Sequence, residues 1–435
     1  MPTAPGRKAV LGHALEFRRD PLGFLRSLRS HGDVVRIHLG PLPVYVLTTP
    51  GLVHRVLVGE AGKYDKGRLF DNARGVIGNG IITSAGAVHR RHRRMIQPAF
   101  HRTVVAEYAE VMSAAASAMA DSWKPGQAIE VAEVMRNLTL GIVVRTMVST
   151  DSDRRLESEL LESLPVFLAG VAWRTYSPAP FLAKIPIPAN RRFDAAVAGM
   201  RGALIRTVET ARATGGENHD VLAMLLAARN DGSGMTDKQI NDELVTLLVA
   251  GTETASSALA WIFHEIAHNP EIEARLREEV DAVLDCRSRP AVADLPALTY
   301  TRRVVDEALR HYGLPALMRR PTVPVNLGGR WLPAGAELLF SPYALHHDPV
   351  TYPEPDRFDP DRESPTDRRA FIPFGGGARQ CIGNEFALME MVIVVATVVA
   401  RWSLRPAPDH TVRPVVTGVV VPNRLPMIPT PRLAA

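Results

Sequence analysis

A glycine-rich turn that carries one cysteine and runs straight into an apolar helix constrains this chain more than any other feature. The turn is Phe374-Gly-Gly-Gly-Ala-Arg-Gln-Cys-Ile-Gly383, and the apolar pattern of residues 384–402 predicts a helix. A thiolate is a soft metal ligand, and as an axial haem ligand it favours cleavage of an O–O bond. Glycines let the backbone approach a flat cofactor, and the positive N-terminal end of a helix stabilises a thiolate. The turn therefore predicts a metal-bearing cofactor held by Cys381.

Two other interpretations of Cys381 stay open at this point. A lone cysteine can be an inert small hydrophobe, or a nucleophile that waits for a histidine partner. Cys286, the second of the two cysteines, lies in a polar stretch and fits the inert description. Two cysteines cannot form a disulfide framework, which indicates a reducing compartment.

The bulk properties predict one large helical unit. The chain has 435 residues, of which 46% are hydrophobic, and no linker, repeat or long charge run divides it, so we expect a single domain over residues 1–435. The first residues contain no apolar stretch long enough for a membrane anchor or a signal sequence, so we expect a soluble, cytoplasmic protein. The net charge is only +5 and no basic stripe with interleaved aromatic residues occurs, which disfavours nucleic-acid binding.

Periodicity predicts a mainly α-helical protein with a small, discontinuous β region. Strands are expected at 34–39 and 44–48 as a hairpin, between 323 and 340, and between 412 and 427. Helices are expected at 103–123, 129–149, 190–214, 220–229, 236–269 and 271–284.

The helix expected at 236–269 contains an unusual polar segment. Thr236 and Gln239 form a capping box at its start, and Pro270 ends it. Its apolar middle carries the segment Ala250-Gly-Thr-Glu-Thr254, although glycine in a helix costs about 1 kcal/mol relative to alanine. A close crossing with another helix would explain the glycine. It would not explain a carboxylate and hydroxyls in an apolar stretch, because a buried charge needs a partner or a function.

Together these features resemble the cytochrome P-450 superfamily of haem-thiolate monooxygenases. The resemblance rests on five fixed positions in the turn, on the segment 250–254 and on Glu307-Ala-Leu-Arg310. It implies an α-rich triangular prism with small discontinuous sheets, in which haem b lies between the long central helix and the helix after the cysteine. In this fold Cys381 is the axial ligand of the haem iron, and Phe374 and Gly383 shape the loop around the sulfur.

The same resemblance assigns the segment in the central helix to oxygen activation. Ala250 and Gly251 leave room for dioxygen, Thr254 hydrogen-bonds the distal oxygen or a water, and Glu253 relays protons from solvent. Delivery of protons to a reacting oxygen is general acid chemistry, which requires a positioned chain of donors. Thr252 is at a variable position of the family.

Two sets of charged residues are implied to support the cofactor. Glu307 and Arg310 share a helix face and, with Arg357 of Pro355-Asp-Arg-Phe358, are expected to form a structural Glu–Arg–Arg cluster. The haem propionates are expected to meet cationic or hydrogen-bonding side chains. The candidates are His89, Arg93, Arg379 and either Arg319 or Arg320, because the segment 311–315 departs from the family pattern and leaves the choice open.

The resemblance also places an apolar pocket over the distal haem face. Its expected lining residues are Phe70, Ile81, Leu247, Leu248, Leu317, Met318 and Val419. Apolar lining with few polar anchors indicates a small hydrocarbon-like substrate. Several stretches, including Asp65-Lys-Gly67, are similar to actinobacterial sesquiterpene oxygenases, which favours a terpene. The charges of Asp65 and Lys66 are interpreted as belonging to the loop surface.

No nucleotide-binding module is recognisable in the sequence, so electrons are expected from a separate ferredoxin and its reductase. The arginines of 90–94 with Arg368 and Arg369 are expected to form a basic rim for an acidic donor. We expect a monomer. Three alternatives differ in function: a peroxide-driven peroxygenase or a haem-dependent dehydratase or isomerase, a non-catalytic haem-binding sensor, and a cysteine hydrolase. Glu253 and Thr254 argue against the first two, because neither needs a proton relay.

Overall fold

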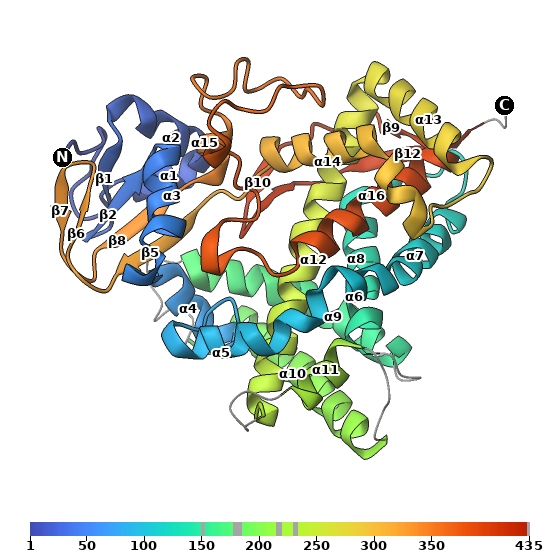
Figure 1. The fold of residues 1–435 in the computed structure, drawn as a ribbon, viewed down its shortest axis with the longest axis horizontal. Coiled ribbons are helices and arrows are strands. Elements are labelled where there is room, and N and C mark those ends of the chain that lie inside the picture. Colours follow the sequence, from blue (N-terminus) through green and yellow to red (C-terminus); the bar gives the residue numbers. More distant parts are fainter. Residues whose placement is uncertain (149–152, 177–184, 215–219, 229–233, 433–435) are drawn as a thin grey trace.

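The computed structural model describes residues 1–148, 153–176, 185–214, 220–228 and 234–432. Helices dominate it, and Figure 1 shows a broad body that narrows towards α10 and α11. The α-helices are α1 (Ala14–Arg19), α2 (Pro21–Ser27), α3 (Pro50–His54), α4 (Arg68–Ile77), α5 (Gly86–Ile96), α6 (Arg102–Glu107), α7 (Ala109–Asp121), α8 (Val131–Met147), α9 (Asp153–Tyr176), α10 (Pro188–Thr214), α11 (Val221–Ala227), α12 (Asp237–His268), α13 (Pro270–Leu284), α14 (Thr299–His311), α15 (Pro342–His346) and α16 (Asn384–Arg401).

The strands form small separate sheets, as predicted. They are β1 (Val34–Leu39), β2 (Leu42–Leu47), β3 (Tyr64–Lys66), β4 (Ile129–Glu130), β5 (Leu317–Pro321), β6 (Val325–Leu327), β7 (Arg330–Leu332), β8 (Glu337–Phe340), β9 (Trp402–Pro406), β10 (Pro414–Val416), β11 (Val420–Pro422) and β12 (Pro426–Pro431). The largest sheet has the order β1-β2-β8-β5-β3, with β2 and β8 parallel and the other pairs antiparallel. The predicted hairpin is confirmed as β1 and β2. The short strands β3 and β5, which were not predicted, prove to position site residues.

The long central helix is confirmed as α12. Its capping box forms as expected: the Thr236 hydroxyl accepts from the Gln239 backbone N–H, and the Gln239 side chain accepts from the Thr236 N–H. In Figure 1 it runs through the middle of the molecule. Among the described residues α12 is the one helix long and apolar enough to suit a membrane span, and 72% of its apolar window is buried inside the protein. Its apolarity therefore matches its place in the core.

One predicted helix is divided in two, and one long helix was not predicted. The helix expected at 103–123 is divided into α6 and α7 at Tyr108. Helix α9 has no counterpart among the predicted helices, and Pro165 lies inside it. Both differences are local and leave the core unchanged, in which α8, α12, α14 and α16 bury their apolar faces against one another.

Candidate active site

A cavity of about 350 Å³ lies where α12, the loop before α16, the α4–α5 region and the segment from α14 to β5 meet. It brings together fifteen of the predicted site residues. These are Phe70, Ile81, His89, Arg93, Leu247, Ala250, Gly251, Thr254, Leu317, Arg319, Phe374, Arg379, Cys381, Gly383 and Val419. Residues more than 300 positions apart in the sequence thus share one chamber.

The cysteine loop is shaped by its glycines and closed by a backbone hydrogen bond. The N–H of Cys381 donates to the carbonyl of Phe374 at 2.9 Å. Gly377 has φ +66°, and a Cβ there would collide with the Leu57 carbonyl, so no other residue fits without rearrangement. Gly383 is the N-cap of α16. The side chain of Cys381 is exposed to the cavity.

The electrostatics at Cys381 differ from the sequence-based expectation. Burial raises the pKa of its thiol, and the opposing effects of the Gly383 N–H and Arg93 are smaller. The helix end alone therefore does not hold a thiolate at neutral pH. A bound metal ion would supply the missing positive charge, because coordination deprotonates a thiol outright. The loop fits a metal-bound thiolate better than a free nucleophile.

One end of the cavity carries a dense group of basic side chains. These are Lys66, His89, Arg93, Arg319 and Arg379, and we call them the cationic cluster. Asp65 is the carboxylate beside it, 3.0 Å from Arg379. Such an excess of buried positive charge calls for an anionic ligand. The two propionates of haem b match this requirement.

Burial and mutual repulsion lower the pKa values of basic side chains in the cationic cluster. Burial lowers the pKa of His89 to about 3, and the positive charges of Arg379, Lys66 and Arg93 add to the effect. Burial and Arg379 lower the pKa of Arg319 to about 10. Burial also lowers the pKa of Lys66 well below its usual range. The neutral His89 ring can therefore offer a hydrogen bond to a ligand, whereas the arginines keep their charge.

Strand alternation decides between the two arginine candidates. On β5, Leu317 and Arg319 line the cavity, and Met318 and Arg320 lie on the opposite face. Met318 packs against the N-terminal strands, and Arg320 pairs with Asp71 at 2.8 Å and with Glu337. The prediction that Met318 lines the pocket is thus wrong, and Arg320 is not at the cofactor site.

Two further corrections concern the lining. Leu248 is fully buried in the main core, because neighbouring positions on a helix point about 100° apart. Lys66 is not on the loop surface: it is 9% exposed and opposes Arg319 across the β3–β5 pair. A three-residue strand is too short to reveal by its pattern which face is buried.

The polar segment of α12 faces the cavity in part. The Thr254 hydroxyl donates to the Ala250 carbonyl at 2.6 Å, and both residues line the cavity. A Cβ on Gly251 would lie 2.8 Å from a methyl of Val143, so this glycine also permits the close crossing of α12 and α8. Glu253 lies outside the lining and accepts from the Thr417 hydroxyl at 3.1 Å. Burial raises the pKa of Glu253, which favours a carboxyl group able to donate a proton.

The structural cluster behind the loop contains a different arginine from the one predicted. Glu307 accepts from Arg310 at 2.7 and 2.8 Å, and Arg362 approaches it at 3.4 Å. The Arg357 guanidinium is 64% exposed and lies near Glu354 and Asp359. Only the Arg357 carbonyl joins the cluster, as an acceptor from Arg310 and Arg362. The prediction for Arg357 is therefore wrong, because the loop directs the Arg357 side chain into solvent. Arg362, further along the same loop, approaches Glu307 in its place.

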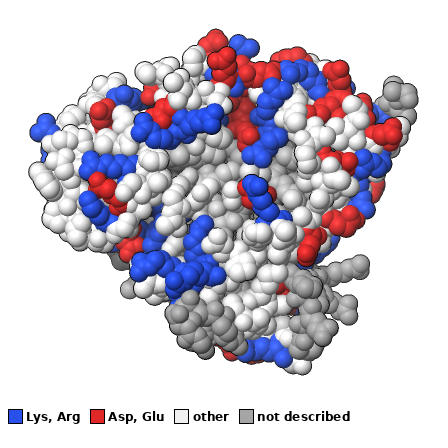
Figure 2. All heavy atoms as spheres, viewed as in Figure 1, with Lys and Arg blue, Asp and Glu red and all other residues white. Residues whose placement is uncertain are grey.

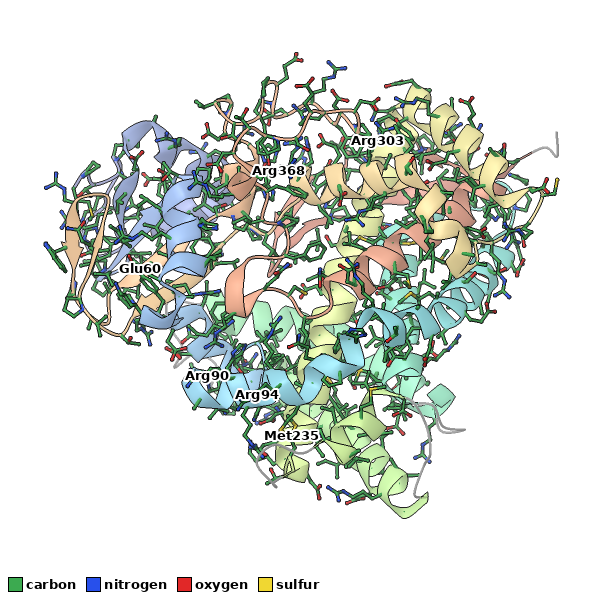
Figure 3. All side chains as sticks on the ribbon, viewed as in Figure 1. Glu60, Arg90, Arg94, Met235, Arg303 and Arg368 are labelled. Atoms are coloured by element: carbon green, nitrogen blue, oxygen red, sulfur yellow. The ribbon has the colours of Figure 1, made fainter. Side chains whose placement is uncertain are left out.

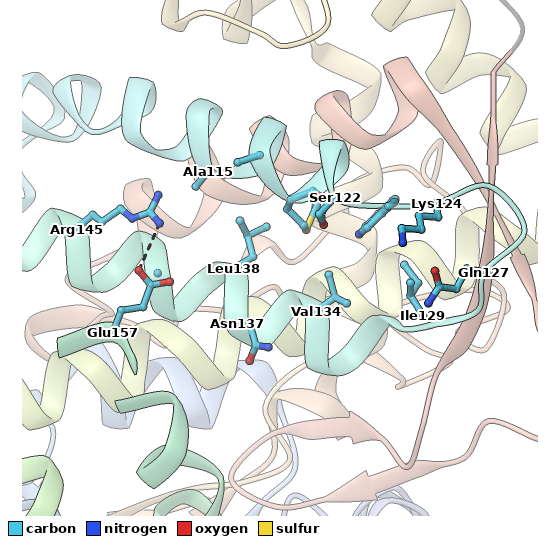
Figure 4. Close-up of a pocket in the computed structure, with 14 residues that line it drawn as sticks. Ala115, Ser122, Lys124, Gln127, Ile129, Val134, Asn137, Leu138, Arg145 and Glu157 are labelled. Carbon is cyan, nitrogen blue, oxygen red and sulfur yellow. Dashed lines mark hydrogen bonds and ion pairs between the residues drawn. The ribbon is translucent and has the colours of Figure 1, made fainter. Parts of the chain in front are cut away.

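A second hollow of about 410 Å³ lies between α7 and α8 (Figure 4). The ion pair between Arg145 and Glu157, at 3.4 Å, lies at one end of it. It contains none of the predicted site residues, and its floor is made of side chains such as Ala115 and Leu138. Thr254, Cys381 and the cationic cluster line the first cavity instead.

Comparison with known proteins agrees with this geometry. The family model described as Cytochrome P450 matches residues 2–429. The chain is similar to cyclooctatin synthase of Streptomyces melanosporofaciens, with 43% identity over 99% of this chain and 95% of the relative. It is also similar to cyclooctat-9-en-7-ol 5-monooxygenase of the same organism, with 41% identity over 99% and 95%. Pentalenene oxygenase of Streptomyces avermitilis is 38% identical over 97% and 96%. A family match over nearly the whole chain, a cysteine loop that suits a metal-bound thiolate and a cationic cluster that suits propionates lead to one conclusion: the chain belongs to the cytochrome P450 family and is a haem-thiolate monooxygenase.

Proposed function

We propose that the substrate is a terpene, either a hydrocarbon or one that carries a single hydroxyl group. The observation that carries this proposal is the apolar part of the cavity lining, which includes Phe70, Ile81, Leu247 and Val419. Apolar walls with few polar anchors suit a hydrocarbon skeleton. The names of two relatives denote an unsaturated hydrocarbon, pentalenene, and an unsaturated alcohol, cyclooctat-9-en-7-ol, which is the same range of polarity.

A spectral titration of the ferric holoprotein tests the substrate class. The panel contains cyclic terpene hydrocarbons, their monohydroxylated forms and fatty acids of matched carbon number. We expect terpenes to shift the iron from low to high spin, because an apolar ligand displaces the axial water. Fatty acids should bind more weakly, since their carboxylate would lose its hydration in the apolar part of the cavity. A shift with fatty acids but with none of the terpenes would contradict the proposal.

Different residues of the chain would bind the cofactor, supply protons and exclude water. Haem b, when bound, supplies the activation of dioxygen and the oxidation of a C–H bond. Cys381 would hold its metal, and the cationic cluster would bind its propionates, with Arg319 and Arg379 supplying fixed charge. Thr254 places a hydroxyl in the cavity, and the Glu253 carboxyl, whose pKa is raised by burial, would supply protons towards it. The apolar walls keep bulk water away.

We expect Thr254→Ala to bind haem and substrate normally but to lose several-fold in product formed per NADPH consumed. Without the hydroxyl, the cavity would lack its positioned proton donor, and electrons would be released as hydrogen peroxide. Thr254→Ser should restore most of the coupling. Thr252→Ala is the matched control, because the Thr252 side chain is buried on another face of the helix and outside the lining. Equal peroxide yields for Thr254→Ala and Thr252→Ala would remove Thr254 from the proton path.

The proposed electron donor is an acidic ferredoxin, supplied by its reductase. Figure 2 shows Lys and Arg side chains gathered over the region of α5, and Figure 3 labels Arg90 and Arg94 there. Both side chains are exposed, and Arg93 of the same helix donates to the Gln380 carbonyl at 2.7 Å, so this surface adjoins the cysteine loop. Arg368 and Arg369 are also exposed, although Arg369 is paired with Asp367. A basic surface near the loop favours an acidic partner by long-range attraction.

Charge reversal of Arg90 and Arg94 together should slow electron transfer from a ferredoxin at least tenfold at low salt. The difference from the unaltered protein should shrink as salt increases, because screening removes the attraction. Arg330→Glu on the distant strand β7 is the control. A rate that does not depend on salt in either protein would refute this docking surface.

The proposal also includes a monomeric protein in the cytoplasm. The apolar helix α12 is used inside the core, and the two cysteines are both free. Size-exclusion chromatography with light scattering tests the oligomeric state.

A further inference from the structure

The segment that departs from the family pattern, His311-Tyr-Gly-Leu-Pro315, places an aromatic pair at the edge of the cavity. Tyr312 lines the cavity just after α14. Its ring stacks on Trp261 of α12 with centroids 4.0 Å apart and planes inclined by 6°. Trp261 is 2% exposed, and its Nε1 donates to the Val420 carbonyl at 2.7 Å. Tyrosine and tryptophan are the side chains that lose an electron most readily, and here they share a ring face.

The Tyr312 hydroxyl has a base beside it. It donates to a carboxylate oxygen of Glu265, and Asn269 Nδ2 donates to the other oxygen at 3.2 Å. As the acceptor for both Tyr312 and Asn269, the Glu265 carboxylate is placed to take the proton of the tyrosyl hydroxyl. Burial raises the pKa of Glu265, which makes its carboxylate a stronger base than an exposed one.

Glu265 also borders a second space. It lines a polar hollow of about 470 Å³, separate from the cavity, together with His268, Asn269 and Arg275. Tyr312 faces the cavity and Glu265 faces this hollow, so the hydrogen bond between them bridges the two spaces.

We propose that Tyr312 and Trp261 form an electron outlet that reduces the oxidant formed from dioxygen in the cavity when no substrate C–H bond is in reach. In this step the Tyr312 O–H bond breaks. One electron passes to the oxidant, the proton passes to the Glu265 carboxylate, and a neutral tyrosyl radical remains. Trp261 is the next electron donor. A soluble thiol or ascorbate restores the pair by supplying one electron for each electron lost, while the proton held on Glu265 returns to the Tyr312 oxygen and the proton of the thiol or ascorbate is released to solvent. The outlet would protect the cofactor and the apolar walls from oxidation.

Tyr108 provides the comparison that makes the proposal specific. It lines the same cavity and is also buried, but its hydroxyl is a buried polar group without a hydrogen-bond partner. Its aromatic neighbour is Phe386, with ring centroids 6.0 Å apart, and phenylalanine is not an electron donor. Tyr108 therefore lacks both the base and the second donor.

The test mixes substrate-free ferric holoprotein with a peroxy acid, freezes it within milliseconds and records the radical by electron paramagnetic resonance. Variants are used only where the reduced carbon monoxide spectrum and haem content match those of the unaltered protein. We expect a tyrosyl or tryptophanyl radical in the unaltered protein and in Tyr108→Phe, and at least a fivefold smaller signal in Tyr312→Phe. Glu265→Gln should reduce the tyrosyl signal as well, because the proton has no acceptor.

Two independent readouts complete the test. Bleaching of the haem absorbance by the peroxy acid should be several-fold faster in Tyr312→Phe and Trp261→Phe than in Tyr108→Phe. Mass spectrometry without added reductant should find oxidation products at Tyr312 and Trp261. An unchanged radical yield and bleaching rate in Tyr312→Phe would overturn the proposal, as would a radical that disappears in Tyr108→Phe.

Discussion

Cys381→Ser will abolish the strongly red-shifted Soret band of the reduced, carbon monoxide-bound protein, and monooxygenase activity will fall to background. The reason is the ligand itself: an alcohol oxygen is a hard, weakly donating ligand, and it cannot replace the soft thiolate. The loop should still fold, because its closure depends on the backbone bond from Cys381 to Phe374 and on the glycines. Absorption spectra of the haem-loaded variant measure the effect.

Cys286→Ser is the matched control for this prediction. Cys286 is exposed and lies in the turn after α13, outside the cavity. Its replacement should leave the spectrum and the activity unchanged. A red-shifted band that persists in Cys381→Ser, in folded and pigment-loaded protein, would show that another residue holds the iron.

Glu307→Ala will yield protein with little haem and a strongly reduced free energy of unfolding. Glu307 is 5% exposed and accepts from Nε and Nη2 of Arg310 and from the Asp359 backbone N–H at 2.9 Å. Its removal leaves the Arg310 guanidinium, 2% exposed, without its counter-charge, which costs about 3–5 kcal/mol. That is a large fraction of the 5–15 kcal/mol, roughly, that stabilises a protein domain. Urea unfolding and the haem content after purification measure it.

Two arginine variants separate the observed cluster from the predicted one. Arg362→Ala should cost several times more stability than Arg357→Ala, because Arg362 approaches Glu307 and donates to the carbonyls of Glu354 and Arg357. The exposed ion pairs of Arg357 contribute under about 1 kcal/mol. If Arg357→Ala were the more damaging of the two, the arrangement described for this loop would be incorrect.

Features that are continuous in the sequence were predictable. The cysteine loop, the segment 250–254 of the central helix and the capping box at Thr236 each act through residues within one or two turns of one another. Their local geometry follows from short-range rules for glycine, helix ends and helix faces. For the same reason the fold class and the β1–β2 hairpin could be predicted, whereas the division of the helix at Tyr108 could not.

The sequence by itself thus determined the cysteine loop, the acid–alcohol segment and the family to which these motifs belong. The tertiary structure alone decided that Arg319 rather than Arg320 faces the cavity, that Lys66 joins it, that Arg362 replaces Arg357, and that Tyr312 stacks on Trp261. Each of these choices depends on long-range pairing: the face of the short strand β5 is fixed by β3 and β8, and Tyr312 meets a helix some fifty positions away. A shift of one residue in a strand reverses every side chain, and no local pattern in so short a segment records which shift the fold selects.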